Sequence, residues 1–265
     1  GIKRLYVGVD GVKVPMVTQV EKIKRRKLRG HKRAGGKRRQ MHTGADNAYK
    51  EFKIAIIYDE SNEHRQVIAT SGNHEVLGRL LRREAGRLRI GDADEKLSVT
   101  DGADWIDRQL ECKLPMLDSH LLDFYHLSEH VWLVANICFG QGNEQAGKFA
   151  SEILHIAKHD GPTALLTRLM DEHKKYRCRG KRKTLKELIQ YIARRFGMCE
   201  YPKFIEKGWQ IGSGPTEAMC KVLTYRLKGA GMRWDKYGAD AIMALVALQQ
   251  SNTWKSYWNL RKQAA

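Results

Sequence analysis

The hydrophobic pattern of this 265-residue chain changes at Leu127. Before that position, short apolar runs with strand spacing alternate with helical stripes. Strands are predicted at residues 4–10, 12–20, 52–58, 65–70, 96–100 and 119–125, and helices at 73–88 and 103–112. From 127 to about 206 the apolar spacing is helical and predicts four or five helices, and two more helices are predicted at 214–228 and about 235–250. The pattern favours an α/β (α+β) chain with a mixed sheet flanked by helices, in which the all-helical stretch is an insertion or a second subdomain.

A dense cluster of positive charge lies between the second and third predicted strands. The window 21–41 holds eleven Lys/Arg residues and one Glu, a net of +10 out of +18 for the whole chain. This window is too polar to pack in a core, so a solvated loop is one expectation. The other is contact with a polyanion, above all nucleic acid, through phosphate binding and counterion release. The residues concerned are Lys22, Lys24, Arg25, Arg26, Lys27, Arg29, Lys32, Arg33, Lys37, Arg38 and Arg39.

The remaining composition excludes several classes of protein. The five cysteines form no C-x-x-C pair, so neither a zinc ribbon nor a disulfide framework is expected, and a reducing cytoplasm is the default compartment. No apolar run reaches the roughly 18 residues that indicate a membrane span. Because the chain starts with Gly1 rather than Met, it is expected to be a fragment or a processed product, from which an N-terminal domain could be missing.

Three carboxylates lie where a sheet presents side chains to a ligand. Asp10 ends the first predicted strand, Asp101 ends the strand that begins at residue 96, and Glu217 lies at the start of a late helix. If the fold gathers them, at least one would hold its proton unless a cation intervenes, and the cations that carboxylates favour are Mg²⁺ and Mn²⁺. Each also has a possible local role. Asp10-Gly11 suits a hairpin turn, Asp101-Gly102 suits a turn or a cap, and a helix start favours Glu217 electrostatically.

The segments around these acids carry a family resemblance. Five sequence segments occur in this order: YVGVDGVKVPM, VTDGAD, LDFYHLSEH, IGSGPTEAMCK, and GMRW followed by GADAIMALVAL. They resemble the DDE transposases of bacterial insertion sequences, most of all the Kra-type group, which is distantly related to Mutator-like transposases. The resemblance runs from Leu5 to about Trp258, nearly the whole chain.

The resemblance implies an RNase H-like core with an all-helical insertion. Residues 1–126 would form the first part of the core, with a basic arm at about 21–50. Residues 127–206 would form the insertion, and residues 207–265 would form the closing helices of the core. By resemblance the catalytic and metal-binding residues are Asp10, Asp101 and Glu217, holding two Mg²⁺ or Mn²⁺ ions, and Asp104 competes with Asp101 for the second place.

Accessory functional residues are expected just after the second acid. By resemblance, Asp123 and His126 match an acidic-x-x-His element, which could orient a metal or a strand, or be a buried His–Asp pair. His126 to His130 also fits H-x-x-E-H, but without a third ligand we expect no zinc peptidase. The aromatic residues at 254–258 are expected in the core, with base stacking as the alternative.

The resulting expectation is a DNA transposase that cleaves and joins strands by phosphoryl transfer. Arg226, Lys228 and Arg233 are expected to contact DNA near the site, in addition to the basic window. The expected partners are the DNA of the element ends and of the target, with the protein a homo-oligomer on DNA and located in the bacterial cytoplasm near the nucleoid. The alternatives are a non-catalytic nucleic-acid-binding protein with a nuclease-like fold, and an RNase H-like nuclease that hydrolyses without joining.

Overall fold

The computed structural model describes residues 3–29, 47–61, 63–229, 232, 234–251 and 253–263. The chain divides into two compact units. The first contains residues 1–94, 108–115 and 215–265, and the second contains 95–107 and 116–214. Helix α3 (Asp104–Lys113) begins in the second unit and ends in the first.

Three antiparallel strands form the sheet of the first unit. They are β1 (Arg4–Met16), β2 (Asn47–Asp59) and β3 (Arg65–Thr70). Strand β2 lies between the other two, with Ile54 opposite Asp10 on β1 and opposite Ala69 on β3. The central positions of β2 are almost fully buried, as expected for a strand covered on both faces.

The predicted hairpin at Asp10-Gly11 is wrong. Residues 4–16 form one continuous strand, and Asp10 lies in its interior rather than in a turn. Strand β2 pairs along nearly the whole of β1, which satisfies far more backbone hydrogen bonds than a hairpin of two short strands would. Asp10 therefore projects from a rigid strand.

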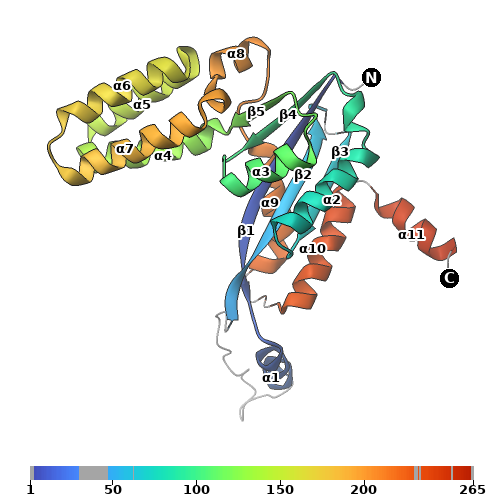
Figure 1. Cartoon of the computed structure of the whole chain (residues 1–265). Helices are drawn as coiled ribbons and strands as arrows, with labels where there is room; N and C mark the ends of the chain where they lie inside the picture. The colour runs from blue at the N-terminus through green and yellow to red at the C-terminus, as the bar shows by residue number, and fades with distance from the viewer. Residues whose placement is uncertain are drawn as a thin grey trace. The chain divides into compact units, whose positions relative to one another are not determined.

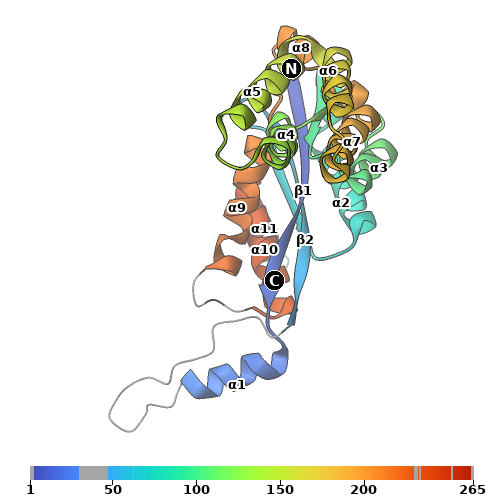
Figure 2. The same cartoon turned by 90° about the vertical axis from the view of Figure 1, so that its left-hand side faces the viewer.

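Helices cover both faces of this sheet. Helix α2 (His74–Arg87) packs against β2 and β3, and α10 (Lys236–Gln250) packs against β3. Figures 1 and 2 show α2 on one face of the strands, and α9 (Gly214–Lys228) with α10 on the other. Side-chain caps explain two of the helix starts, because Asn73 accepts from the N–H of Val76 and Asp235 from that of Gly238.

Part of the basic window forms a helix. Helix α1 (Gln19–Arg29) replaces the predicted loop over the described part of the window, because Lys and Arg favour helix and the Thr18 hydroxyl accepts from the N–H of Glu21. Residues 30–46 lie outside the described part of the chain.

The C-terminal aromatic residues do not enter the core. No residue of α11 (Trp254–Gln263) is buried, and the exposed fractions of Trp254, Tyr257 and Trp258 are 37–40%. Their rings pack against one another instead, with centroid separations of 5.6 and 5.2 Å. The expectation that they are core residues is wrong.

The second unit combines two parallel strands with a helical bundle. Strands β4 (Glu95–Thr100) and β5 (Ser119–Leu122) pair with Thr100 opposite Leu122. The predicted strand at 119–125 is shorter than expected because Asp123 caps the next helix. The helices are α4 (Phe124–Phe139), α5 (Glu144–His159), α6 (Gly161–Lys175), α7 (Arg179–Arg194) and α8 (Tyr201–Glu206).

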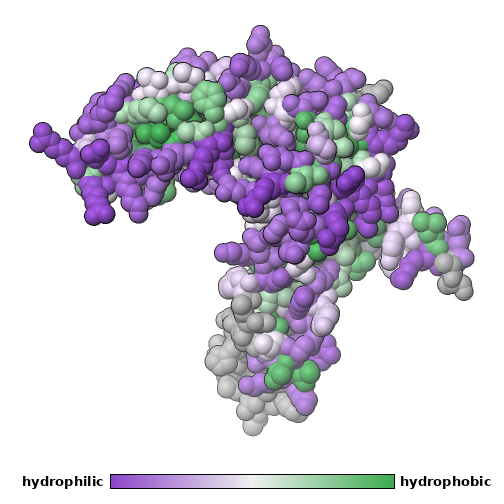
Figure 3. Space-filling model, in the orientation of Figure 1, coloured by the Kyte–Doolittle hydropathy of each residue, from purple (hydrophilic) through white to green (hydrophobic). Residues whose placement is uncertain are grey.

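Four of these helices pack as a bundle. Helix α4 contacts α5 and α7, and α6 contacts α5 and α7. Hydrophilic residues cover most of the face seen in Figure 3, with an apolar patch over the bundle. Secondary structure thus confirms the helical stretch and the mixed α/β class, while an RNase H-like fold and a separate insertion domain stay predictions. Within the described ranges, no helix is long and apolar enough to cross a membrane.

Candidate active site

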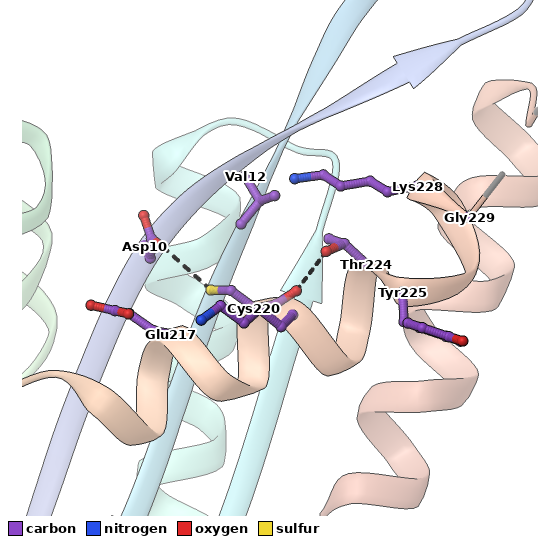
Figure 4. A pocket seen from close by; sticks show the side chains of 9 residues that line it. Asp10, Val12, Glu217, Cys220, Thr224, Tyr225, Lys228 and Gly229 are labelled. Atoms are coloured by element: carbon purple, nitrogen blue, oxygen red, sulfur yellow. Dashed lines mark hydrogen bonds between the residues drawn. The ribbon is translucent and has the colours of Figure 1, made fainter.

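A pocket of about 430 Å³ lies in the first unit between β1 and α9. It is lined by Asp10, Val12, Glu217, Cys220, Lys221, Thr224, Tyr225, Lys228 and Gly229. Figure 4 shows Asp10 and Glu217 at one end of this pocket and Lys228 toward the other. The fold therefore brings two of the three predicted catalytic acids, one from each end of the sequence, to the same pocket.

A glycine on β1 allows α9 to approach the strand closely. A Cβ atom at Gly8 would lie 1.8 Å from Oγ1 of Thr216, in the first turn of α9. Thr216 is buried, and within the described part of the chain its hydroxyl has no hydrogen-bond partner. Because side chains alternate along a strand, Asp10 lies on the same face of β1 as Gly8. This packing sets the spacing between Asp10 and Glu217.

Hydrogen bonds fix the Asp10 carboxylate. Its Oδ1 accepts from the N–H of Gly11 at 2.6 Å, and its Oδ2 accepts from Sγ of Cys220 at 3.4 Å. Burial, together with the nearby charge of Asp10, raises the pKa of the Cys220 thiol, so this group stays protonated and donates. Cys220 was not predicted from the sequence, although it lies one helical turn after Glu217.

The Glu217 carboxylate is exposed and accepts no hydrogen bond from another described residue. A local role as a reciprocal capping residue is therefore not supported, although a first-turn acid still suits the helix dipole. Its side chain lines the pocket instead. An acidic side chain left open to a pocket beside Asp10 suits a cation ligand.

One face of α9 carries the rest of the site. Lys221, Tyr225 and Lys228 follow Glu217 by four, eight and eleven residues and line the pocket with it. Neither lysine forms an ion pair with another described side chain, and Tyr225 is 78% exposed. Lys228 was predicted from the sequence, whereas Lys221 and Tyr225 were missed; their helical spacing from Glu217 was the available signal.

Asp101 lies in the second unit, directly after β4. Its Oδ1 accepts from the N–H of Ala103 at 2.9 Å, so the predicted turn at Asp101-Gly102 is present. Its approach to Asp10 and Glu217 stays a prediction. No group of three or more His, Cys, Asp or Glu side chains at metal-binding spacing occurs among the described residues.

The accessory acids have structural partners. Asp104 is exposed and lies 3.2 Å from Nη2 of Arg195. Asp123 is buried; its Oδ1 accepts from the N–H of Tyr125 at 2.9 Å and its Oδ2 from the hydroxyl of Ser213 at 2.5 Å. The bond from Tyr125 makes Asp123 the N-cap of α4, and a catalytic role for Asp123 stays a prediction.

His126 is not paired with Asp123. Its Nδ1 lies 3.5 Å from the Glu129 carboxylate, and its ring is 4.9 Å from that of His130. The described contacts thus contain no His126–Asp123 pair, and the alternative of a buried His–Asp pair is wrong. A role for His126 in orienting metal or DNA stays a prediction.

The predicted DNA-binding residues fall into three groups. Lys24, Arg26 and Lys27 are exposed on α1, whereas Lys22 pairs with Asp235. Arg226 is exposed on α9 but does not line the pocket that contains Lys228. The remainder lie outside what is described, either as whole residues or as side chains: Arg25, Arg29, Lys32, Arg33, Lys37, Arg38, Arg39 and Arg233.

Comparisons with known proteins were made for the whole chain. No protein-family model matches it, and no curated protein does. Among solved structures it is similar to a chain of the Drosophila P element transposase strand transfer complex, with 14% sequence identity and a TM-score of 0.29. The match covers 97% of this chain but 65% of that chain, so this chain spans less than two thirds of the neighbour's length. A likeness with so low a TM-score does not define a family.

Proposed function

We propose that this chain is a DNA transposase of the DDE type. The observation that carries the proposal is the pocket shared by Asp10 and Glu217, which lie near opposite ends of the sequence. The resemblance assigns the first and last catalytic acids to these two residues, one on the first strand and one on a late helix. Asp101 is proposed as the third acid, within an RNase H-like core.

The donor set suits a hard divalent cation. Asp10 and Glu217 offer carboxylate oxygens, which Mg²⁺ and Mn²⁺ prefer. Asp10, Glu217 and Asp101 would hold two ions. When bound, these ions would supply charge stabilisation and activation of the attacking oxygen in phosphoryl transfer.

The chain's own contribution is binding and orientation. Cys220 and the N–H of Gly11 hold the Asp10 carboxylate, and the packing of α9 on β1 places Glu217 near it. Lys221 and Lys228 would neutralise the phosphates of a strand in the pocket, and Tyr225 offers a face on which a base can stack. The exposed cations of α1 would bind the DNA backbone further away.

The test is Glu217→Gln, which removes a ligand charge and keeps the size of the side chain. We expect unchanged binding to element-end DNA, and a loss of at least about a hundredfold in cleavage and strand joining. Glu144→Gln is the matched control, because Glu144 is an exposed acid in the first turn of α5. Cleavage that survives in Glu217→Gln removes Glu217 from the mechanism.

The same assay separates the alternatives. Metal-dependent cleavage with joining of donor to target DNA supports a transposase. Cleavage without joining indicates a nuclease, and binding without cleavage in the wild-type chain indicates a binding protein. An assembly of several protomers on paired ends would support the proposed homo-oligomer.

A further inference from the structure

The loop that carries Asp101 is short and contains a left-handed residue. It joins the end of β4 at Thr100 to the start of α3, and Gly102 has a φ of +72°. Such a loop has few ways to fix the direction of a side chain by itself. The hydrogen bond from the N–H of Ala103 to Asp101 Oδ1 holds the carboxylate only if the loop backbone is itself held.

Helix α7 supplies the first anchor through Tyr191. Its hydroxyl donates to the backbone carbonyl of Asp101 at 3.0 Å, although 90 residues separate the two positions. The ring is packed by His130, whose centroid lies 4.4 Å away. The hydroxyl is therefore directed at the loop by a fixed ring.

Arg195, just after α7, supplies the second anchor. Its Nε and Nη2 both donate to the carbonyl of Gly102, at 2.7 and 2.5 Å, and its Nη1 donates to the carbonyl of Tyr191 at 3.2 Å. The guanidinium also stacks over the Tyr191 ring at 4.3 Å, and the side chain is 11% exposed. Its planar set of donors is thus shared between the loop and α7.

Gly102 is required for this contact. A Cβ atom there would lie 2.4 Å from Nε of Arg195, and the positive φ would strain any side chain. The glycine that makes the turn is also what lets the guanidinium reach the backbone.

We propose that Tyr191 and Arg195 are positioning residues, which fix the Asp101 loop so that the carboxylate is held ready for a divalent cation. The proposal depends on the function proposed for Asp101 above. It gives the helical bundle a part in the chemistry, because α7 holds the loop that carries Asp101. Outer contacts that orient a metal ligand typically matter by tenfold or more in metal affinity or activity.

The experiment uses Tyr191→Phe, which deletes one hydrogen bond and keeps the ring, and Arg195→Lys, which keeps the charge and loses the two-nitrogen contact. Arg194→Ala is the matched control, an exposed arginine on the same helix. Thermal unfolding by circular dichroism identifies any variant that fails to fold. Three quantities are measured for the folded variants: amide hydrogen exchange at residues 101–107, Mn²⁺ binding without DNA by electron paramagnetic resonance, and the Mg²⁺ dependence of cleavage.

We expect faster exchange at Ala103 and a three- to tenfold weaker apparent affinity for Mn²⁺ in Tyr191→Phe, with a similar or larger effect in Arg195→Lys. Half-maximal cleavage should need correspondingly more Mg²⁺, while the KM for DNA stays unchanged. A purely structural role would lower the active fraction without moving the Mg²⁺ dependence. Exchange like that of the wild type, or an unchanged metal dependence in both variants, overturns the proposal.

Failure of the proposed function gives a different result. A wild-type chain that binds Mn²⁺ but cleaves no DNA would contradict the transposase assignment. The positioning role of Tyr191 and Arg195 would still be tested by hydrogen exchange and by Mn²⁺ binding. A wild-type chain that neither binds Mn²⁺ nor cleaves would overturn both.

Discussion

The close approach of α9 to β1 gives a sharp prediction for Gly8→Ala. The added Cβ would lie 1.8 Å from Oγ1 of Thr216, 2.9 Å from its Cβ and 3.1 Å from its Cγ2. Contacts between nonbonded heavy atoms are favourable near 3.5–4.0 Å, so the helix and strand must separate by about 1.5–2 Å at this point. Overpacking of a close-packed interior costs about 1–3 kcal/mol, and so large an overlap belongs at the upper end.

A double-mutant cycle isolates this contact. Thr216→Ala removes the atoms at 1.8 and 3.1 Å and leaves the Cβ contact at 2.9 Å. It should cost little alone, because the hydroxyl has no hydrogen-bond partner among the described residues. Combined with Gly8→Ala, it should recover about 1–2 kcal/mol of the loss in the free energy of unfolding.

The assay is urea unfolding followed by circular dichroism, with strand cleavage as a second measurement. Gly86→Ala is the matched control, because a Cβ there meets nothing within 4 Å and Gly86 lies in a helix, where alanine gains about 0.5 kcal/mol. Gly8→Ala is expected to lower cleavage as well, since it moves the helix that carries Glu217. If Gly8→Ala unfolds like the wild type, or if the two substitutions are additive, the packing argument is wrong.

Two further predictions concern the pocket lysines and the reactivity of the cysteines. Lys221→Gln and Lys228→Gln should each weaken DNA binding about equally across sequences and reduce the slope of log K against log salt by about 1. Alkylation at neutral pH should modify Cys178 well before Cys220. The N–H groups of Lys181 and then Gly180 lower the pKa of Cys178, whereas burial and the charge of Asp10 raise that of Cys220. The alkylation rates of Cys178 and Cys220 should both rise with pH, because the thiolate is the nucleophile. The rise for Cys220 should occur at a higher pH than the rise for Cys178.

Controls exist for both predictions. Lys186→Gln changes an exposed lysine on α7 and should leave the salt slope unchanged. A salt slope that Lys221→Gln does not change would show that DNA does not bind in the pocket. For the cysteines, mass spectrometry of the labelled peptides reports each site, with the exposed Cys112 as an internal reference. Early modification of Cys220 in the folded protein would show that its thiol is neither buried nor held against Asp10.

Local pattern was sufficient for most helices and strands. The apolar spacing predicted α2, α3, α9 and α10 to within a few residues, because a helical stripe depends only on neighbours three and four positions apart. The same local reasoning failed at Asp10-Gly11. A turn and a strand interior are equally compatible with that dipeptide, and the decision came from pairing with β2, some forty residues later.

The candidate site shows the same division. The sequence alone identified Asp10, Asp101 and Glu217 as acids at element ends, and it placed a concentrated positive charge between two strands. Tertiary structure decided that Glu217 faces a pocket with Asp10 rather than capping its own helix, because Gly8 lets α9 lie against β1. It also decided that Tyr191 and Arg195 hold the Asp101 loop. Contacts of this kind join residues far apart in the chain, and their energy depends on distances that no local pattern encodes.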